Sequence, residues 1–358
     1  MSRKRVIYQS EALFAGPTGS NPVQLNRVQS ANYSFDITRQ DVNQYGQLAA
    51  IDRVIVEQPT VSLDFSYYAN TGENEQNLGF FLGTSKGALA EILSGGADVK
   101  NYYILVSPEG TDANVTPSAI VTGQGKTIGI GNGGLTSYSV EAAVGGFPTV
   151  TVNAEALNMK FYGATTGFSP TVRSSDGFPN NTQTFSLPQP TTGNGYTALR
   201  PGDVTLSISG IGVDSSDLKI QSFTLSTDIG RDPIQKLGSK YAFSREITFP
   251  VTVTASVEAI IGDIAGTDNL GNALTDIVCN DGNSYDLSFT LGRPSADCND
   301  STLDTPYAMR YTLKGAKLDS QEFSSAIGDN KSVTLGFSAQ IGGPNDTNKG
   351  LFIENNAS

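Results

Sequence analysis

Two short segments carry residue types that could bind a ligand, and the first resembles the end of a phosphate-binding loop. Gly125, Lys126 and Thr127 match its last residues; in such loops backbone N–H groups and a lysine hold phosphates at the start of a helix. The motif also needs an earlier glycine, where this chain has Ile120, and a following helix. Residues 128–134 are rich in glycine and predict a turn-rich loop instead, so nucleotide binding is disfavoured.

The second segment, from Cys279 to Asp286, has the oxygen-rich composition of a calcium loop. A helix–loop–helix calcium site needs a glutamate at its twelfth position and helices on both sides, and the sequence indicates neither. We interpret the segment as a polar hairpin turn. Cys279 and Cys298 are the only cysteines; a local disulfide between them is possible, but free thiols are favoured in a chain made in a reducing compartment.

The composition disfavours catalysis. The chain has no histidine, which removes the commonest general base near neutral pH and the usual ligand of transition metals. A histidine-based triad is impossible, and no pair of carboxylates stands out as a glycosidase pair. The absence of tryptophan disfavours a sugar-binding module. We therefore expect no enzymatic activity, no catalytic residue, no cofactor and no metal.

Composition also limits the fold and the partners. The 358 residues include 39 Gly and 16 Pro, which disfavour long helices, whereas β-branched and aromatic residues favour strands. The net charge of −12 disfavours nucleic-acid binding, and the basic run Arg3–Arg5 is best read as part of a solvated arm. No stretch approaches the roughly 18 apolar residues of a membrane helix, and no secretory signal is indicated, so we expect folding in a cytoplasm without a membrane anchor.

An internal repeat is the most informative feature of the sequence. Val28–Phe65 aligns without a gap with Ile220–Val257, at a constant offset of 192 residues. The identical pairs are Gln29 and Gln221, Ser30 and Ser222, Ser34 and Ser226, Asp36 and Asp228, Ile37 and Ile229, Arg39 and Arg231, Gly46 and Gly238, Ala50 and Ala242, Arg53 and Arg245, Ile55 and Ile247, Thr60 and Thr252, and Val61 and Val253. Apolar and polar residues alternate in the same phase in both copies, which predicts strands with one buried face.

The repeat predicts an all-β protein with two tandem β-sandwich or partial-barrel domains, each with a short flanking helix. Later strands repeat at a different offset of 183, as at Val150 and Val333. The expected helices are Ala88–Leu93 and Asn272–Ile277. The predicted divisions are an N-terminal arm at 1–27, a first domain at 28–163, a proline-rich linker at 164–199, a second domain at 200–343 and a C-terminal arm at 344–358.

Both copies resemble the tail tube proteins of long-tailed bacteriophages. The resemblance is carried by Val28–Arg39 with the following Val42–Tyr68, and by Ile220–Arg245. It implies a structural virion protein, assembled in the host cytoplasm with other tail proteins, whose stacked rings form the conduit for DNA. In that family one sheet joins its neighbours around a ring and lines the channel, and a long loop between two early strands reaches the next ring.

The implied ring-stacking loops fall at Asp41–Asp52 and Asp232–Ser244. Their expected contact residues are Asp41, Val42, Gln44, Gly46 and Asp52 in the first loop, and Asp232, Ile234, Lys236, Gly238 and Ser244 in the second. The candidates for a subunit interface or the channel wall are Asp36, Arg39, Arg53, Asp228, Arg231 and Arg245. We expect the matched aspartates on an acidic channel surface, and the matched arginines in ion pairs between subunits.

The resemblance also suggests a stoichiometry. Rings of that family typically hold six equivalent domains, so two domains per chain predict a trimeric ring with pseudo-sixfold symmetry, with a hexamer as the alternative. An acidic wall offers no cations to phosphates, so DNA would pass without specific binding. The competing interpretations are another tail or neck component of a virion, and a surface adhesin or pilin-like β-repeat protein, which the lack of a secretory signal disfavours.

Overall fold

The computed structural model describes most of the chain. The described residues are 11–17, 21–95, 98–107, 126–162, 166–168, 185–186, 204–209, 218–238, 244–261, 284–293, 304–325 and 330–355, with the single residues 7, 109, 113, 199, 202 and 242. Strands dominate these residues and the two helices are short. The predicted all-β class is therefore confirmed. No helix within the described ranges is both long and apolar enough to cross a membrane.

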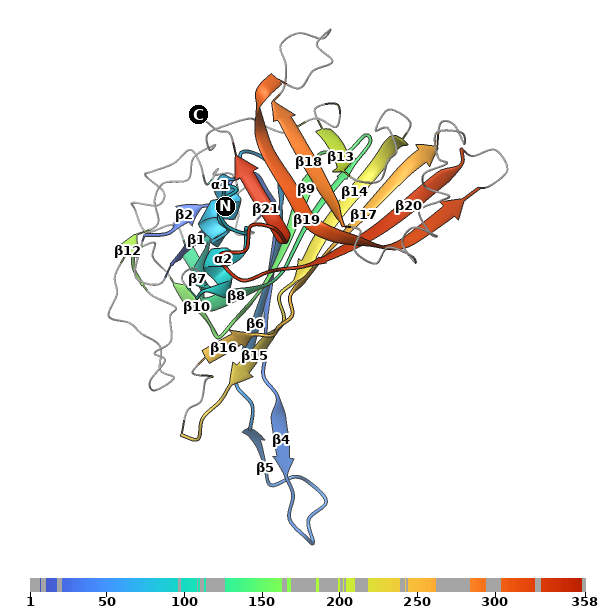
Figure 1. The fold of residues 1–358 in the computed structure, drawn as a ribbon. Helices are drawn as coiled ribbons and strands as arrows, with labels where there is room; N and C mark the ends of the chain where they lie inside the picture. The colour runs from blue at the N-terminus through green and yellow to red at the C-terminus, as the bar shows by residue number, and fades with distance from the viewer. Residues whose placement is uncertain are drawn as a thin grey trace.

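The N-terminal repeat contains the first ten strands and both helices (Figure 1). Their bounds are β1 Glu11–Pro17, β2 Val23–Gln24, β3 Val28–Asp36, β4 Arg39–Val42, β5 Asp52–Ile55, β6 Thr60–Tyr68, α1 Glu73–Leu78, α2 Ala90–Leu93, β7 Val99–Val106, β8 Lys126–Ala143, β9 Thr149–Ala156 and β10 Asn158–Tyr162. A two-stranded ladder of β11 (Thr166–Phe168) and β12 (Phe185–Ser186) follows within the predicted linker.

The C-terminal repeat contains the remaining strands. Their bounds are β13 Val204–Ser209, β14 Leu218–Asp228, β15 Arg231–Ile234, β16 Ser244–Ile247, β17 Thr252–Ile261, β18 Tyr285–Arg293, β19 Asp304–Ser324, β20 Ser332–Gln340 and β21 Gly350–Asn355.

The two repeats share one order of antiparallel strand pairing. In the N-terminal repeat the order is β3–β6–β9–β8–β7–β1, with β10 beside β8. In the C-terminal repeat it is β14–β17–β20–β19–β18–β13, with β21 beside β19. Each long strand, β8 or β19, pairs with one set of neighbours along its first half and another along its second half. Each repeat is therefore bent into two connected sheet layers.

The register matches the predicted offsets as well. Val61 lies opposite Phe35, and Val253 lies opposite Thr227, which preserves the offset of 192. Both first strands have a β-bulge at a matched glutamine, and each glutamine side chain donates to the carbonyl two residues earlier: Gln29 to Arg27 (3.0 Å) and Gln221 to Lys219 (3.1 Å). The same residue types thus produce the same local irregularity.

The long strands β8 and β19 also share a bulge. It falls between Leu135 and Ser137 in β8 and between Leu318 and Ser320 in β19, which is the offset of 183. The partners confirm this alignment, because Leu135 lies opposite Ala154 and Leu318 lies opposite Phe337. Residues of β8 and β19 can therefore be compared position by position.

The two repeats are joined edge to edge in one continuous sheet. Ser222–Asp228 of β14 pairs antiparallel with Ser137–Ala143 of β8. The main sheet consequently runs through eight strands in the order β3–β6–β9–β8–β14–β17–β20–β19 (Figure 1). One cluster of buried apolar side chains extends through both repeats. The structure thus differs from two separate domains, since the repeats share a sheet and a core.

The core lies on one face of this sheet because apolar residues occupy every second position. In β6, for example, Val61, Leu63, Phe65 and Tyr67 are buried. The segment with α1 and α2 lies over strand β21 of the other repeat: Ala88 N–H donates to the Leu351 carbonyl (2.7 Å), and Gly83 N–H to the Ile353 carbonyl (2.7 Å). The N-terminal repeat therefore covers part of the C-terminal one.

Several boundary predictions differ from the structure. The predicted N-terminal arm contains β1, whose Leu13 and Phe14 are buried, and the predicted C-terminal arm contains β21, whose Phe352 is buried. Both strands are short and complete the smaller sheet layer, so no long alternating pattern marks them. Residues 128–134 are part of strand β8 and not a turn-rich loop. Their glycines fit a buried strand whose faces are both covered.

The helix predictions are met in part. The helix predicted at Ala88–Leu93 is α2, which begins at Ala90, whereas α1 was not predicted. The helix predicted at Asn272–Ile277 lies outside the described residues, as do both cysteines and most of the linker.

Candidate assembly surface

The junction between β8 and β14 shows how one repeat binds another. Arg231, at the start of β15, is 1% exposed; its Nε donates to the Leu135 carbonyl (2.8 Å), and its guanidinium forms an ion pair with Asp98. Arg231 lies so close to β8 that a Cβ on Gly134 would be 2.6 Å from its Cζ. Glycine at this position therefore leaves the space that the Arg231 guanidinium occupies.

A second arginine crosses the same junction. Arg245 of β16 is 6% exposed, and its Nη2 donates to a Glu155 carboxylate oxygen on β9 (2.9 Å). Burial lowers the pKa of the Arg245 guanidinium, and Glu155 opposes that shift. Arg231 and Arg245 were predicted to form ion pairs between subunits; in the structure both form ion pairs within one chain, between its two repeats.

On the core side of the junction, the buried carboxylate of Glu75 contacts side chains of both repeats. Glu75 of α1 is 1% exposed. Its Oε1 accepts hydrogen bonds from the hydroxyl groups of Tyr67 (2.8 Å), Tyr138 (3.1 Å) and Tyr311 (3.4 Å), and the last two hydroxyls are 2.8 Å apart. Tyr138 belongs to β8 and Tyr311 to β19, so this cluster connects the repeats. Burial raises the pKa of Glu75, and the tyrosine hydrogen bonds oppose the rise.

The main sheet has two outer edges. At one end, β3 pairs only with β6; at the other, Lys317–Ser324 of β19 pairs only with β20, as far as the described residues show. Each edge exposes an aromatic side chain, because Phe35 of β3 is 59% exposed and Phe323 of β19 is 55% exposed. The equivalent positions at the internal junction, Thr227 and Val140, are 2% and 0% exposed. Sequence reasoning missed these edges, because an edge is visible only once pairing is known.

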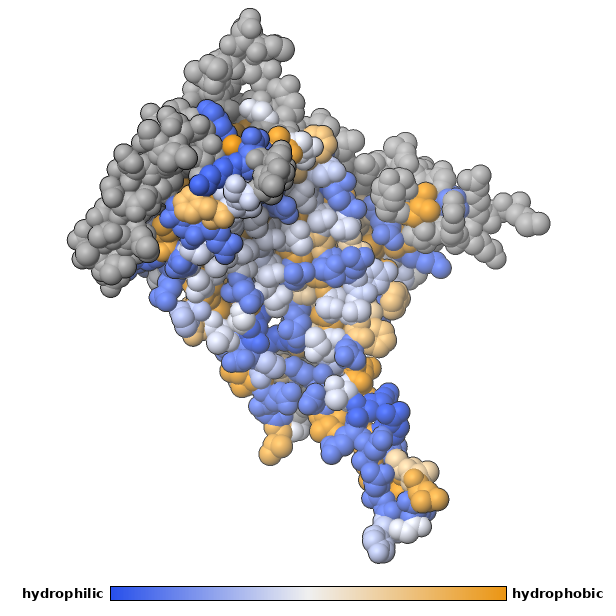
Figure 2. Space-filling model, turned by 90° about the vertical axis from the view of Figure 1, so that its right-hand side faces the viewer, coloured by the Kyte–Doolittle hydropathy of each residue, from blue (hydrophilic) through white to orange (hydrophobic). Residues whose placement is uncertain are grey.

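The matched hairpins differ in their surroundings. The β4–β5 hairpin projects away from the sheet and exposes every residue of both strands (Figure 1). Its apex carries the fully exposed Tyr45 and Leu48, and Figure 2 shows apolar surface near the end of this narrow projection. The β15–β16 hairpin contacts the N-terminal repeat through Ala242, whose N–H donates to Gln58 and which packs against Leu157, while Leu237 in its turn is fully exposed.

The predicted stacking residues all lie in these hairpins, although several are in strands rather than loops. Across the strands, Val42 pairs with Asp52, Asp41 with Arg53, Ile234 with Ser244, and Asp232 with Glu246. Asp41 also forms an ion pair with Arg53 (2.7 Å). The remaining predicted residues, Gln44, Gly46, Lys236 and Gly238, lie between the paired strands. Gly46 and Gly238 both have left-handed backbones, with φ of 90° and 83°. Such a φ favours glycine, which explains the matched residue.

The face of the main sheet opposite the core is polar and acidic. Hydroxyl pairs link neighbouring strands at matched positions, as between Ser34 and Ser62 (2.7 Å) and between Ser226 and Thr254 (2.8 Å). The acidic residues of this face are Asp36, Asp64, Glu141, Glu155, Asp228, Glu258 and Glu322, whereas its described basic residues are Lys219 and Lys317. Asp36 and Asp228 are both exposed, and Arg39 is exposed in β4.

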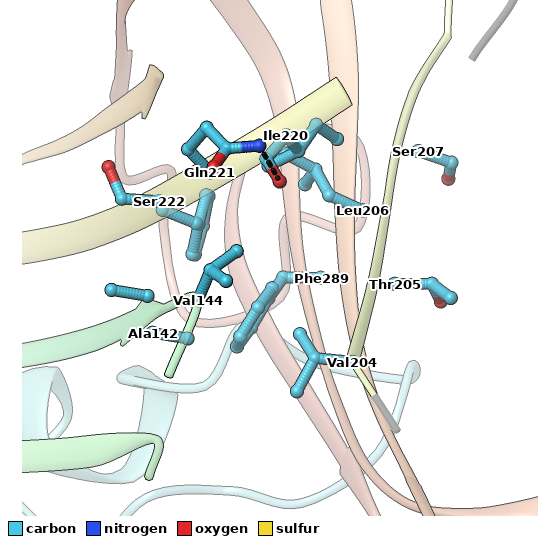
Figure 3. Close-up of a pocket in the computed structure, with 12 residues that line it drawn as sticks. Ala142, Val144, Val204, Thr205, Leu206, Ser207, Ile220, Gln221, Ser222 and Phe289 are labelled. Atoms are coloured by element: carbon cyan, nitrogen blue, oxygen red, sulfur yellow. Dashed lines mark hydrogen bonds between the residues drawn. The ribbon is translucent and has the colours of Figure 1, made fainter. Parts of the chain in front are cut away.

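A groove of about 410 Å³ opens at the end of β14 that is remote from the β15–β16 hairpin (Figure 3). Its lining is mainly apolar and includes Val144, Val204, Leu206, Ile220 and Phe289. Within the described residues no group of three His, Cys, Asp or Glu side chains could hold a metal ion. No family model matches this chain, and no curated protein matches its sequence.

Proposed function

We propose that the chain is a structural subunit that polymerises side by side into rings, and that the rings stack into the tail tube of a bacteriophage. The observation that carries this proposal is the eight-stranded sheet, whose two outer strands have no further partner strand among the described residues. Open edges pair readily with other chains, and closing a sheet across subunits removes them. The exposed Phe35 and Phe323 on these edges support burial against a partner.

Ring stacking is assigned to the β4–β5 hairpin. It stands clear of the sheet, and its apex bears Tyr45 and Leu48 fully exposed to solvent. Apolar side chains at the end of a projection favour contact with another surface. Such a contact along the tube axis leaves the sheet edges available for pairing within the ring.

The channel wall is assigned to the polar face of the main sheet. Its hydroxyl-rich surface carries an excess of acidic residues, including the matched Asp36 and Asp228. Negative charge repels phosphates, and hydroxyl groups do not replace the cations around DNA. This face would therefore let DNA slide through into the host without specific binding.

The pairing of repeats within one chain favours three chains per ring. With six repeats in a ring, three chains would contribute about 24 strands to a closed sheet. Electron microscopy of the purified protein tests the proposal. We expect tubes with a central channel and threefold symmetry of the density. Six chains per ring would overturn the trimer, and a protein that stays monomeric at all concentrations would overturn the tube.

A further inference from the structure

We infer that Ala31–Asp36 of β3 in one chain pairs antiparallel with Ser320–Ser325 at the end of β19 in the next chain, in the register that β14 and β8 already have within one chain. This inference rests on the proposed ring assembly and adds its lateral contact. The internal junction supplies the template, because β3 is the repeat equivalent of β14, and β19 is the repeat equivalent of β8.

The register follows from the two offsets. Subtracting 192 from a β14 residue gives its β3 equivalent, and adding 183 to a β8 residue gives its β19 equivalent. Thr224 faces Glu141 in the template, so Asn32 of one chain faces Ser324 of the next. Within the described residues the inferred partners are Ala31 with Ser325, Asn32 with Ser324, Tyr33 with Phe323, Ser34 with Glu322, Phe35 with Gln321, and Asp36 with Ser320.

The core side of this pairing is chemically consistent. Tyr33 would lie opposite Phe323, and aromatic side chains that face each other across two strands stabilise a sheet. Phe35 would lie beside them, opposite Gln321. Both exposed phenylalanines thereby leave water, as the residues in their template positions do. The template itself has Leu225 opposite Val140 at the position of the aromatic pair.

The polar side of the pairing brings no like charges together. Glu322 faces Ser34, and Asp36 faces Ser320, so each carboxylate lies opposite a hydroxyl. In the template, Asp228 likewise lies opposite a serine. Like charges directly opposite each other would weaken the pair. A shift by two residues, in contrast, would place Asp36 opposite Glu322.

The two junctions differ in one respect. Gly134 leaves space for the Arg231 side chain inside the chain, but its β19 equivalent is Lys317. Arg39, the equivalent of Arg231, therefore cannot occupy the matching place against the next chain. The inferred junction between chains depends on aromatic contacts, whereas the internal junction depends on buried arginines. This difference lets the two kinds of junction be perturbed separately.

Disulfide cross-linking tests the register. With Cys279 and Cys298 replaced by Ser, one variant carries Asn32→Cys with Ser324→Cys. The matched control carries Asp36→Cys with Ser324→Cys, which the inferred register separates by about 13 Å. All three positions are exposed, so folding is preserved. After mild oxidation of assembled tubes, we expect intermolecular cross-links in the first variant at a yield at least about tenfold above the control, since a disulfide needs Cβ atoms roughly 4 Å apart.

The outcomes separate the register from the proposed function. A cross-linked ladder that ends at three chains in the Asn32 variant supports both. Equal or higher yield in the Asp36 control overturns the register while the tube stands. Tubes that give no cross-link with Asn32, and none with a second pair, Ser34→Cys with Glu322→Cys, overturn the edge pairing. Protein that never assembles overturns the tube itself and the lateral contact with it.

Discussion

Replacing Tyr67 with Phe tests whether the buried cluster around Glu75 stabilises the junction between the repeats. The Tyr67 hydroxyl donates a hydrogen bond to Glu75 Oε1 at 2.8 Å. Tyr138 and Tyr311 also bond to each other, so they keep a partner whatever happens to Tyr67. Removing the Tyr67 hydroxyl therefore takes one short bond from the carboxylate and leaves the rest of the cluster in place.

The magnitude follows from the charge of the acceptor. A hydrogen bond to a charged group contributes about 1.5–3 kcal/mol, against roughly 1 kcal/mol for a neutral one. We therefore expect Tyr67→Phe to lower the free energy of unfolding by about 2 kcal/mol when Glu75 is ionised. The matched control is Tyr102→Phe. Tyr102 is fully buried, but its hydroxyl has no hydrogen-bond partner among the described residues, so its removal should leave stability unchanged within about 0.5 kcal/mol or raise it.

The effect should depend on pH. The pKa of Glu75 is raised above its unfolded value of 4.5, so ionising it costs more in the folded protein. Its contribution to stability is present below the unfolded pKa and is lost as the pH rises through the folded pKa. Tyr67→Phe raises the folded pKa of Glu75 further, because it removes a bond that favours the carboxylate. The loss from this substitution should thus be larger at pH 8 than near pH 4.5, where it falls to about 1 kcal/mol.

Urea unfolding followed by far-ultraviolet circular dichroism measures these differences, because the chain has no tryptophan to report by fluorescence. The variants should be compared under conditions in which sedimentation shows that they have the same oligomeric state. If Tyr67→Phe lowers the free energy of unfolding by less than about 0.5 kcal/mol at pH 8, the stabilising role of the bond to Glu75 is refuted, because a charged acceptor should give a larger loss. A loss of equal size for Tyr102→Phe would refute it as well.

Three further predictions concern the junctions and the hairpin. Arg245→Ala should lower the free energy of unfolding by about 1–3 kcal/mol in urea unfolding, whereas the exposed repeat equivalent, Arg53→Ala, should change it by less than about 0.5 kcal/mol; equal effects would contradict the buried contact. Phe323→Asp should abolish tubes in electron micrographs while circular dichroism stays unchanged, and Val144→Asp, at an exposed turn, should preserve them; tubes from both variants would count against the edge. Shortening residues 43–51 should leave folded protein that forms rings without long tubes, and the assignment of stacking fails if long tubes persist.

The sequence was informative wherever one residue pattern determined local structure. The alternation of apolar and polar residues in Val61–Phe65 and Val253–Val257 predicted two strands with one buried face each. The structure has these strands, with the predicted face buried and the predicted register. Matched glycines predicted the hairpin turns, because Gly46 and Gly238 both adopt a left-handed backbone. These features depend on neighbours in the chain, so composition and spacing are sufficient to find them.

The junction and its edges could not be predicted in the same way. The pairing of β8 with β14 joins residues about 85 positions apart, and no local signal distinguishes the paired half of β8. Glu75 lies in a short segment of mixed polarity, and its burial depends on tyrosines from β6, β8 and β19. Strands β1 and β21 are strands only because β7 and β19 offer them an edge.

The repeats share one chain yet have diverged at their contacts, and this has an evolutionary consequence. In an assembly of identical single-repeat subunits, one substitution alters every junction at once. In this chain a change at Gly134 or Arg231 alters the internal junctions alone, and a change at Phe323 alters only the edge at the end of the chain. The residues of one junction can therefore change while those of the other junction stay the same. The two hairpins differ in this way, because β4–β5 is exposed along both strands whereas β15–β16 contacts the neighbouring repeat.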